Sequence, residues 1–143
     1  AEILLNYAEA VNEAYGPDVT PPGYPMTAKA ALQMVRDRAS TLLPAVTATG
    51  TDDFRAVIKH ERRIEFAFED HRYWDLLRWK DAEQVLKQPL KGVKVSRNPD
   101  NTFSYTVINV SNRFFNAPAM YYFPFPQAEI SNSKGTLQQN PGY

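Results

Sequence analysis

Apolar residues recur at helical spacing through residues 1–88, and glycine and proline mark where each helix must end. Residues 1–15 have this spacing, and Gly16 followed by Pro17 predicts the end of a first helix, with glycine as a left-handed cap. Thr27 predicts the start of a second helix that continues through Arg38 and ends near Ser40. Four residues are expected to form its inward stripe: Ala31, Leu32, Val35 and Ala39.

A third helix is predicted to begin at Thr51, Asp52 and Asp53, whose side-chain oxygens can cap its first turn. The spacing of five apolar residues predicts its buried face: Phe54, Val57, Ile58, Ile64 and Phe68. A further helix, or a continuation of the third, is predicted over residues 71–86, before Pro89 closes the helical region. We therefore expect the helices of residues 1–88 to pack as antiparallel pairs.

The pattern changes after residue 88, where apolar and polar residues alternate in two short runs. Val93 and Val95 lie in the first run, and Phe103, Tyr105 and Val107 lie in the second. Residues 98–101 (NPDN) separate the runs and are typical of a turn. The alternation predicts a small β-hairpin.

The C-terminal segment from residue 112 contains several prolines and glycines, which leave little room for long regular structure. It is nevertheless too apolar for a free tail, because it contains Phe114, Phe115, Met120, Tyr121, Tyr122, Phe123 and Phe125. We expect this segment to pack back on the helices. Residues 1–143 are thus expected to form one mainly α domain, helical over residues 1–88, with a hairpin and a packed loop segment over residues 89–143.

Composition excludes several classes of protein. Sixteen Lys and Arg balance sixteen Asp and Glu, so the chain has no summed basic field to attract nucleic acid or anionic lipid. The absence of cysteine excludes disulfides, thiolate metal sites and cysteine nucleophiles. No apolar run approaches the roughly 20 residues that span a bilayer. Because the first residues already have helical spacing, we expect a fragment of a longer protein, so any signal peptide or lipid-attachment cysteine would lie upstream of these residues.

The densest charged stretch is residues 61–75, within the third predicted helix and the residues that follow it. At about 100° per residue, Glu61 and Glu65 fall on the same apolar face as Phe54 and Ile58. Unpaired buried carboxylates are very costly, so nearby arginines must meet them. We expect a structural ion network of six residues: Arg38, Glu61, Arg62, Glu65, Glu69 and Arg72.

Paired carboxylates also allow a glycosidase interpretation, with Glu61 and Glu65 as acid and nucleophile or base. The nearby arginines favour ionised carboxylates, however, whereas a general acid must hold a proton. A metal site is not predicted, because His60 and His71 are far apart in sequence and no Glu-x-x-His or His-Glu-x-x-His motif occurs. No phosphate-binding loop or nucleophile elbow is present, and no cofactor is expected.

Aromatic residues crowd the region of residues 68–79, where Phe68, Tyr73, Trp74 and Trp79 are expected to belong to the core. The alternative is that one or two aromatic rings form a platform for sugar rings, whose C–H faces stack on aromatic side chains. Tyrosines on loops suit that role better than tryptophans within a helix. Tyr24 and Tyr121 are the candidate ligand-binding residues.

Three separated stretches resemble the C-terminal region of the SusD/RagB family. Residues 5–10 (LNYAEA) and 35–39 (VRDRA) resemble the family phrases L-x-Y-A-E-A and V-R-x-R-A. Residues 61–76 resemble E-R-R-x-E-L-x-x-E-G-x-R-W-x-D-L, with Asp70 where glycine is usual. Residues 122–132 and 139–143 (QNPGY) resemble the family's ending, with Phe125 in place of isoleucine. The hairpin is the part that does not align.

This resemblance implies a tetratricopeptide-like helical fold in a non-catalytic subunit that binds oligo- or polysaccharide, or peptide, for nutrient uptake. It implies a lipoprotein on the outer face of the outer membrane, whose partner is a SusC-like TonB-dependent transporter. It assigns no ligand-binding residue. Two alternatives stay open: a protein-interaction module that contacts the transporter without a small-molecule site of its own, and a glycoside hydrolase that uses Glu61 and Glu65.

Overall fold

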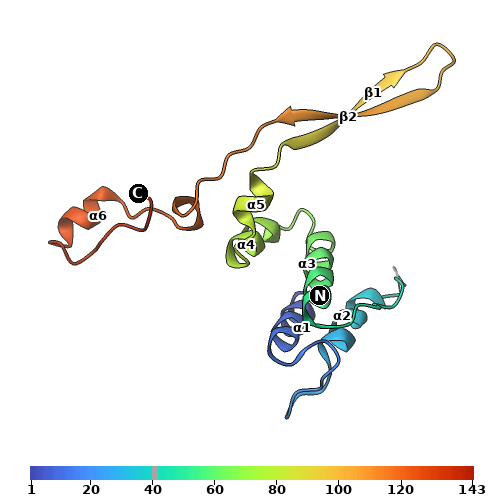
Figure 1. Cartoon of the computed structure of the whole chain (residues 1–143), viewed down its shortest axis with the longest axis horizontal. Helices are drawn as coiled ribbons and strands as arrows, with labels where there is room; N and C mark the ends of the chain where they lie inside the picture. Colours follow the sequence, from blue (N-terminus) through green and yellow to red (C-terminus); the bar gives the residue numbers. More distant parts are fainter. Residues whose placement is uncertain (40–41) are drawn as a thin grey trace. The chain divides into compact units, whose positions relative to one another are not determined.

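The computed structural model describes residues 1–39 and 42–143. The chain divides into two compact units, Ala1–Arg72 and Tyr73–Tyr143. Within the described residues it is mainly helical, with a single two-stranded antiparallel sheet (Figure 1). The predicted fold class is therefore confirmed.

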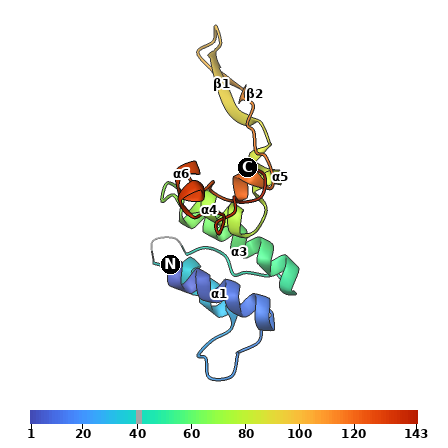
Figure 2. The ribbon, with the colours of Figure 1, turned by 90° about the vertical axis from the view of Figure 1, so that its left-hand side faces the viewer.

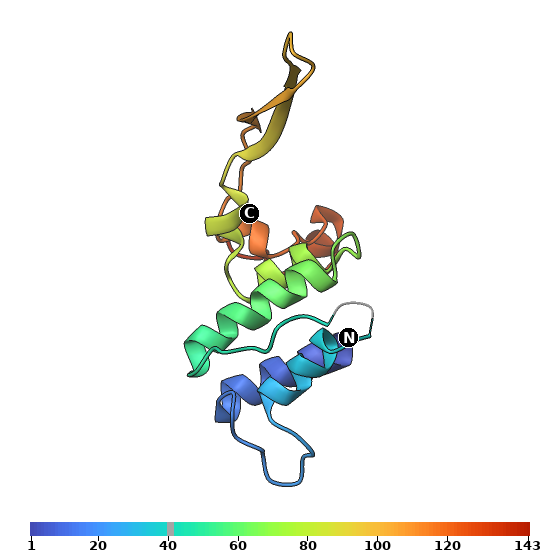
Figure 3. The same ribbon diagram turned by 90° about the vertical axis from the view of Figure 1, so that its right-hand side faces the viewer.

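The first unit is built on three helices: α1 (Glu2–Tyr15), α2 (Ala28–Arg36) and α3 (Thr51–Glu65). Helix α1 packs against both α2 and α3, and Figure 3 shows the three helices side by side. These helices bury apolar residues at helical spacing. The buried residues form one apolar core, together with Phe66 just after α3: Leu5, Ala8, Val11, Ala28, Ala31, Leu32, Val35, Phe54, Ile58 and Phe66.

The ends of α1 and α2 follow local side-chain and backbone chemistry. Thr27 caps α2 as predicted, because its hydroxyl accepts a hydrogen bond of 3.0 Å from the backbone N–H of Ala30. Helix α2 ends two residues before the predicted Arg38, and Ala39 is exposed, so its assignment to the inward stripe is wrong. The predicted end near Ser40 lies outside the described residues. Gly16 ends α1 with a φ of 87° but a ψ of 172°, so its positive φ is not a left-handed helical cap.

Helix α3 differs from its prediction at both ends. Its N-cap is Gly50 and makes no side-chain hydrogen bond, whereas Asp52 and Asp53 lie in the first turn, where carboxylates favour the helix dipole. The helix ends at Glu65, before the periodicity reaches Phe68. Ile64 is exposed on α3, and Phe68, with a φ of 66°, is fully exposed beyond it, so the assignment of both residues to the buried face is wrong. Phe66 is buried instead.

The second unit begins within α4 (His71–Arg78), which is followed by α5 (Ala82–Leu86). The single helix predicted over residues 71–86 is therefore two helices, separated at a turn where Lys80 has a φ of 61°. Strands β1 (Leu90–Arg97) and β2 (Phe103–Ser111) pair antiparallel, with Val93 opposite Val107. This confirms the predicted hairpin, which Figure 2 shows beyond α5.

The C-terminal segment contains a 3-10 helix, η1 (Ala119–Tyr121), and a short helix that was not predicted, α6 (Gln127–Asn132). Phe115 is fully buried with Leu76 and Ala82, and six partly buried residues surround this second core: Leu77, Val85, Leu86, Ala117, Met120 and Tyr121. The expected packing on the helices is thus confirmed for Phe115, Met120 and Tyr121. Phe114 and Phe123 are exposed.

Two compact units can belong to one domain or to two, so the expectation of a single domain over residues 1–143 stays a prediction. None of the helices in the described part of the chain is long and apolar enough to cross a membrane.

Candidate functional site

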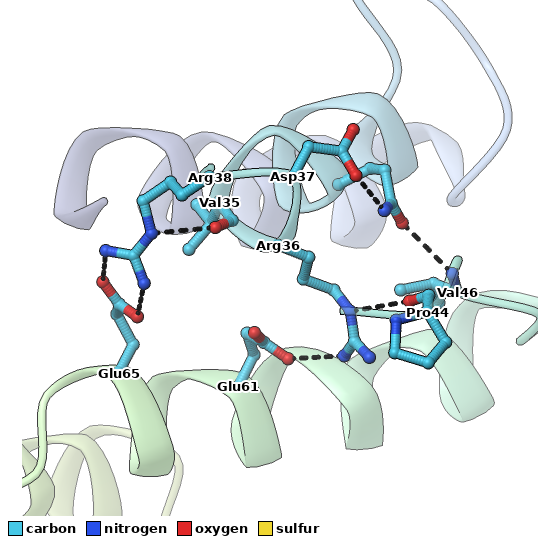
Figure 4. A network of polar contacts seen from close by, with 9 residues as sticks. Val35, Arg36, Asp37, Arg38, Pro44, Val46, Glu61 and Glu65 are labelled. Carbon is cyan, nitrogen blue, oxygen red and sulfur yellow. Dashed lines mark hydrogen bonds and ion pairs between the residues drawn. The ribbon is translucent and has the colours of Figure 1, made fainter. Parts of the chain in front are cut away.

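The two predicted core carboxylates of α3 are paired with arginines at the end of α2 (Figure 4). Glu61 is buried, and its Oε2 lies 2.7 Å from Nη1 of Arg36. The Nε of Arg36 also donates a hydrogen bond of 3.1 Å to the carbonyl of Pro44. Arg36 therefore joins α3 to the end of α2 and to the segment that follows it.

Glu65 forms the second pair. Nη1 and Nη2 of Arg38 each donate a hydrogen bond of 2.6 Å to one oxygen of Glu65, in the bidentate geometry that suits guanidinium and carboxylate. The Nε of Arg38 donates to the carbonyl of Val35 at 3.0 Å. Arg38 is about half exposed, so this pair lies nearer to solvent than the Glu61 pair.

The other residues predicted for this network have different surroundings. Arg62 is buried, donates a hydrogen bond of 2.6 Å to Asn6 Oδ1, and lies 5.0 Å from the ring centre of Phe66. Glu69 is exposed in the turn after α3, and Arg72 lies in the first turn of α4. Arg36 was missed, although it lies four residues after the buried Leu32 and therefore on the same face of α2.

A cleft of about 600 Å³ lies within the second unit. It is lined by aromatic and cationic residues from two stretches of chain: Trp74, Leu77, Arg78, Lys80, Tyr121, Tyr122, Phe123 and Asn140. Trp74 and Phe123 are 51% and 66% exposed, and their ring centres lie 6.2 Å apart. The cleft therefore presents two neighbouring aromatic rings to solvent.

Polar groups complete the lining of this cleft. The Nζ of Lys80 lies 4.5 Å from the ring centre of Tyr121 and 4.9 Å from that of Tyr122. Asn140 Nδ2 donates a hydrogen bond of 2.7 Å to the carbonyl of Phe123. An aromatic wall with a few polar groups suits a ligand that has flat C–H faces together with polar or anionic groups.

The two predicted ligand-binding tyrosines lie in different units. Tyr121 lines the cleft, but its hydroxyl donates to the Lys80 carbonyl at 2.9 Å and accepts from the Glu83 N–H at 3.1 Å. Tyr24 is exposed and lines a smaller hollow of about 250 Å³ in the first unit, with its ring centre 6.2 Å from that of Tyr7. A ligand-binding role for either tyrosine stays a prediction.

Trp74 was assigned to the core, and the structure corrects this assignment. Trp74 and Tyr73 are exposed, and Trp79 is partly buried. Because Trp74, Leu77 and Arg78 are spaced i, i+3 and i+4, they share one face of α4. Leu76, on the opposite face, is buried. That helical arrangement was the signal that could have placed Trp74 at a surface.

Among the described residues, no three His, Asp or Glu side chains group as metal ligands.

Comparison with known proteins places the chain in a family. The SusD family model matches residues 1–143. SusD-like protein P2 of Formosa agariphila is 28% identical over 149 residues, which cover all of this chain and 25% of that protein.

Two solved structures from Bacteroides fragilis are also similar. A SusD-like protein is 34% identical with a TM-score of 0.76, over 99% of this chain and 24% of its own. A SusD-like carbohydrate binding protein is 33% identical with a TM-score of 0.66, over 91% of this chain and 26% of its own. The chain spans about a quarter of the length of these relatives. With a match over all its residues, the chain belongs to the SusD family.

Proposed function

We propose that this chain is the C-terminal part of a longer, non-catalytic subunit that binds glycans for nutrient uptake. The observation that carries the proposal is the match of the SusD family model to all 143 residues. It is supported by the 33% identity to a solved SusD-like carbohydrate binding protein.

The cleft of the second unit is the proposed ligand site in this part of the protein. Its exposed Trp74 and Phe123 rings can stack on the C–H faces of a sugar. The Asn140 side chain and the Lys80 ammonium lie beside these rings as hydrogen-bonding groups for hydroxyls. Such a combination of aromatic area and a few polar groups is typical of small-molecule sites.

The cellular setting is proposed from the family resemblance alone. The full-length protein would be a lipoprotein on the outer face of the outer membrane, held by an N-terminal lipid. It would deliver its ligand to a SusC-like TonB-dependent transporter.

The alternative of a glycoside hydrolase that uses Glu61 and Glu65 gains no support from the geometry. Both carboxylates are already bound to arginine side chains, Glu61 to Arg36 and Glu65 to Arg38. Glu61 is also buried, so a substrate would have to displace a buried ion pair to reach it. These contacts suit a role in holding α3 against α2.

The test is calorimetric titration of the purified full-length protein with a panel of polysaccharides and oligosaccharides. We expect heat of binding with at least one glycan and no release of reducing sugar during incubation. Absence of binding heat with every glycan of the panel would contradict glycan binding, and release of reducing sugar would contradict a non-catalytic role. Isolation of the protein with a transporter but without affinity for any glycan would favour the protein-interaction module.

A further inference from the structure

The residues that line the cleft in the second unit carry positive charge. Two of its lining residues, Arg78 and Lys80, are cationic, and none of the lining residues that the structure describes is acidic. Two carboxylates are near in sequence. Asp81 directly follows Lys80 but is not among the residues that line the cleft. Asp75 is buried and binds Arg78, with Nη2 of Arg78 2.9 Å from its Oδ1. This pair balances Arg78, so Lys80 is the side chain that gives the cleft its positive charge.

The backbone of Lys80 is held by hydrogen bonds on both sides of its Cα atom. Its N–H donates a hydrogen bond of 3.1 Å to the carbonyl of Leu77, and its own carbonyl accepts from the Tyr121 hydroxyl at 2.9 Å. Its φ of 61° is a left-handed conformation that a non-glycine residue holds only where its surroundings enforce it. The hydrogen bonds around Lys80 therefore hold its backbone in a strained conformation.

The side chain of Lys80 is positioned as well. Its ammonium lies over the rings of Tyr121 and Tyr122, beside the rim that Trp74 and Phe123 form. A cation over aromatic rings keeps its charge and its hydrogen-bond donors without needing a carboxylate partner. An anion that enters the cleft would therefore meet a directed ammonium group.

We propose that this cleft selects acidic saccharides, with a sugar ring stacked on Trp74 and Phe123 and its anionic substituent bound by Lys80. The inference rests on the proposed function and narrows its ligand class. The shared chemistry is an anionic group on a sugar, either a uronate carboxylate or a sulfate ester. A charge-assisted hydrogen bond from an ammonium group is about twice as strong as one between neutral groups.

The test is calorimetry on the full-length protein with oligogalacturonate, with a sulfated oligosaccharide and with a neutral oligosaccharide of the same length. We expect at least one acidic ligand to bind more tightly than the neutral one, and its affinity to fall at high salt. Comparison of the two acidic ligands distinguishes uronate from sulfate.

Variants locate the effect at Lys80. Lys80→Gln is expected to weaken binding of the acidic ligand about tenfold, which is the effect of losing one charge-assisted hydrogen bond. It is expected to weaken binding of the neutral ligand much less, because the glutamine amide can still donate hydrogen bonds to hydroxyls. Lys80→Arg keeps the charge and is expected to keep the preference. Lys87→Gln is the matched control, since Lys87 lies just after α5 and pairs with Glu83 instead of lining the cleft.

Two results would overturn the inference: equal affinity for acidic and neutral ligands, or an equal loss of both in Lys80→Gln. In either case a glycan still binds, so the proposed function stands. If no glycan binds at all, the proposed function and this inference fall together. Thermal unfolding of each variant shows whether a lower affinity results from loss of the fold. If Lys80→Gln does not fold, Lys80→Arg tests the inference: a retained preference for the acidic ligand supports it, and a lost preference contradicts it.

Discussion

The Glu61→Gln substitution tests whether burial sets the strength of the ion pairs between α2 and α3. The side chains of Glu61 and Arg36 are 8% and 18% exposed, so water can do little to replace the lost carboxylate. Removing one partner of a buried pair typically costs about 3–5 kcal/mol. Arg36 keeps its hydrogen bond to Pro44, so we expect a loss near the lower limit, about 3 kcal/mol of unfolding free energy.

Glu65→Gln is the matched comparison on the same helix. Its partner Arg38 is 48% exposed, so water screens this pair and can hydrate the guanidinium once the charge is removed. We therefore expect a loss of only about 1 kcal/mol.

Urea unfolding of the full-length protein, followed by circular dichroism, measures both losses of unfolding free energy. Each loss appears as a lower midpoint urea concentration, while the dependence of the unfolding free energy on urea concentration stays the same. We expect the Glu61→Gln midpoint to fall clearly further than that of Glu65→Gln. Equal shifts, or a larger shift for Glu65→Gln, would refute the reasoning from burial.

Three further predictions concern the first unit. Leu32→Ala should lower the unfolding free energy by about 2–5 kcal/mol because Leu32 is fully buried, and a smaller loss in urea unfolding would argue against that packing. Thr27→Ala should cost about 1 kcal/mol by removing the acceptor for the Ala30 N–H, whereas Thr27→Ser should restore the stability. Hydrogen bonds from Arg55 hold the pKa of Glu13 below its ordinary value of 4.5. The stabilisation from this pair should therefore be complete above that pH and be lost as the pH falls through the lowered pKa. NMR titration should show that Arg55→Gln raises the pKa of Glu13, and an unchanged value would contradict the pairing.

Much of the fold was predictable because the periodicity of apolar residues reports directly on which face of an element is buried. Leu32 and Ile58 lie in the core where helical spacing placed them, and Val93 pairs with Val107 in the predicted hairpin. Thr27 was recognisable because the chemistry of an N-cap is local in sequence.

Helix ends and breaks were less predictable, because they depend on backbone conformations that residue type does not reveal. Phe68 and Lys80 both adopt positive φ, which few non-glycine residues do. An apolar Phe68 therefore looked like a continuation of α3, and the break at Lys80 was hidden in a helical pattern.

The candidate site was predicted only in part. Tyr121 was named from the sequence and does line the cleft, but Trp74 and Phe123 were not named as ligand contacts. The cleft combines residues of α4 with residues more than 40 positions later, and no local pattern reports such a meeting. Trp74 looked like core because a tryptophan in a helix is usually buried on one side.

The most direct test of the proposed binding site is the dissociation constant of the full-length protein for its tightest glycan, measured for wild type and for Trp74→Ala. Trp74 is half exposed and its ring forms one wall of the cleft. We predict that the dissociation constant rises by about tenfold or more in Trp74→Ala, because the stacking surface is lost while the fold remains. An unchanged dissociation constant in a folded variant would contradict a glycan site in this cleft.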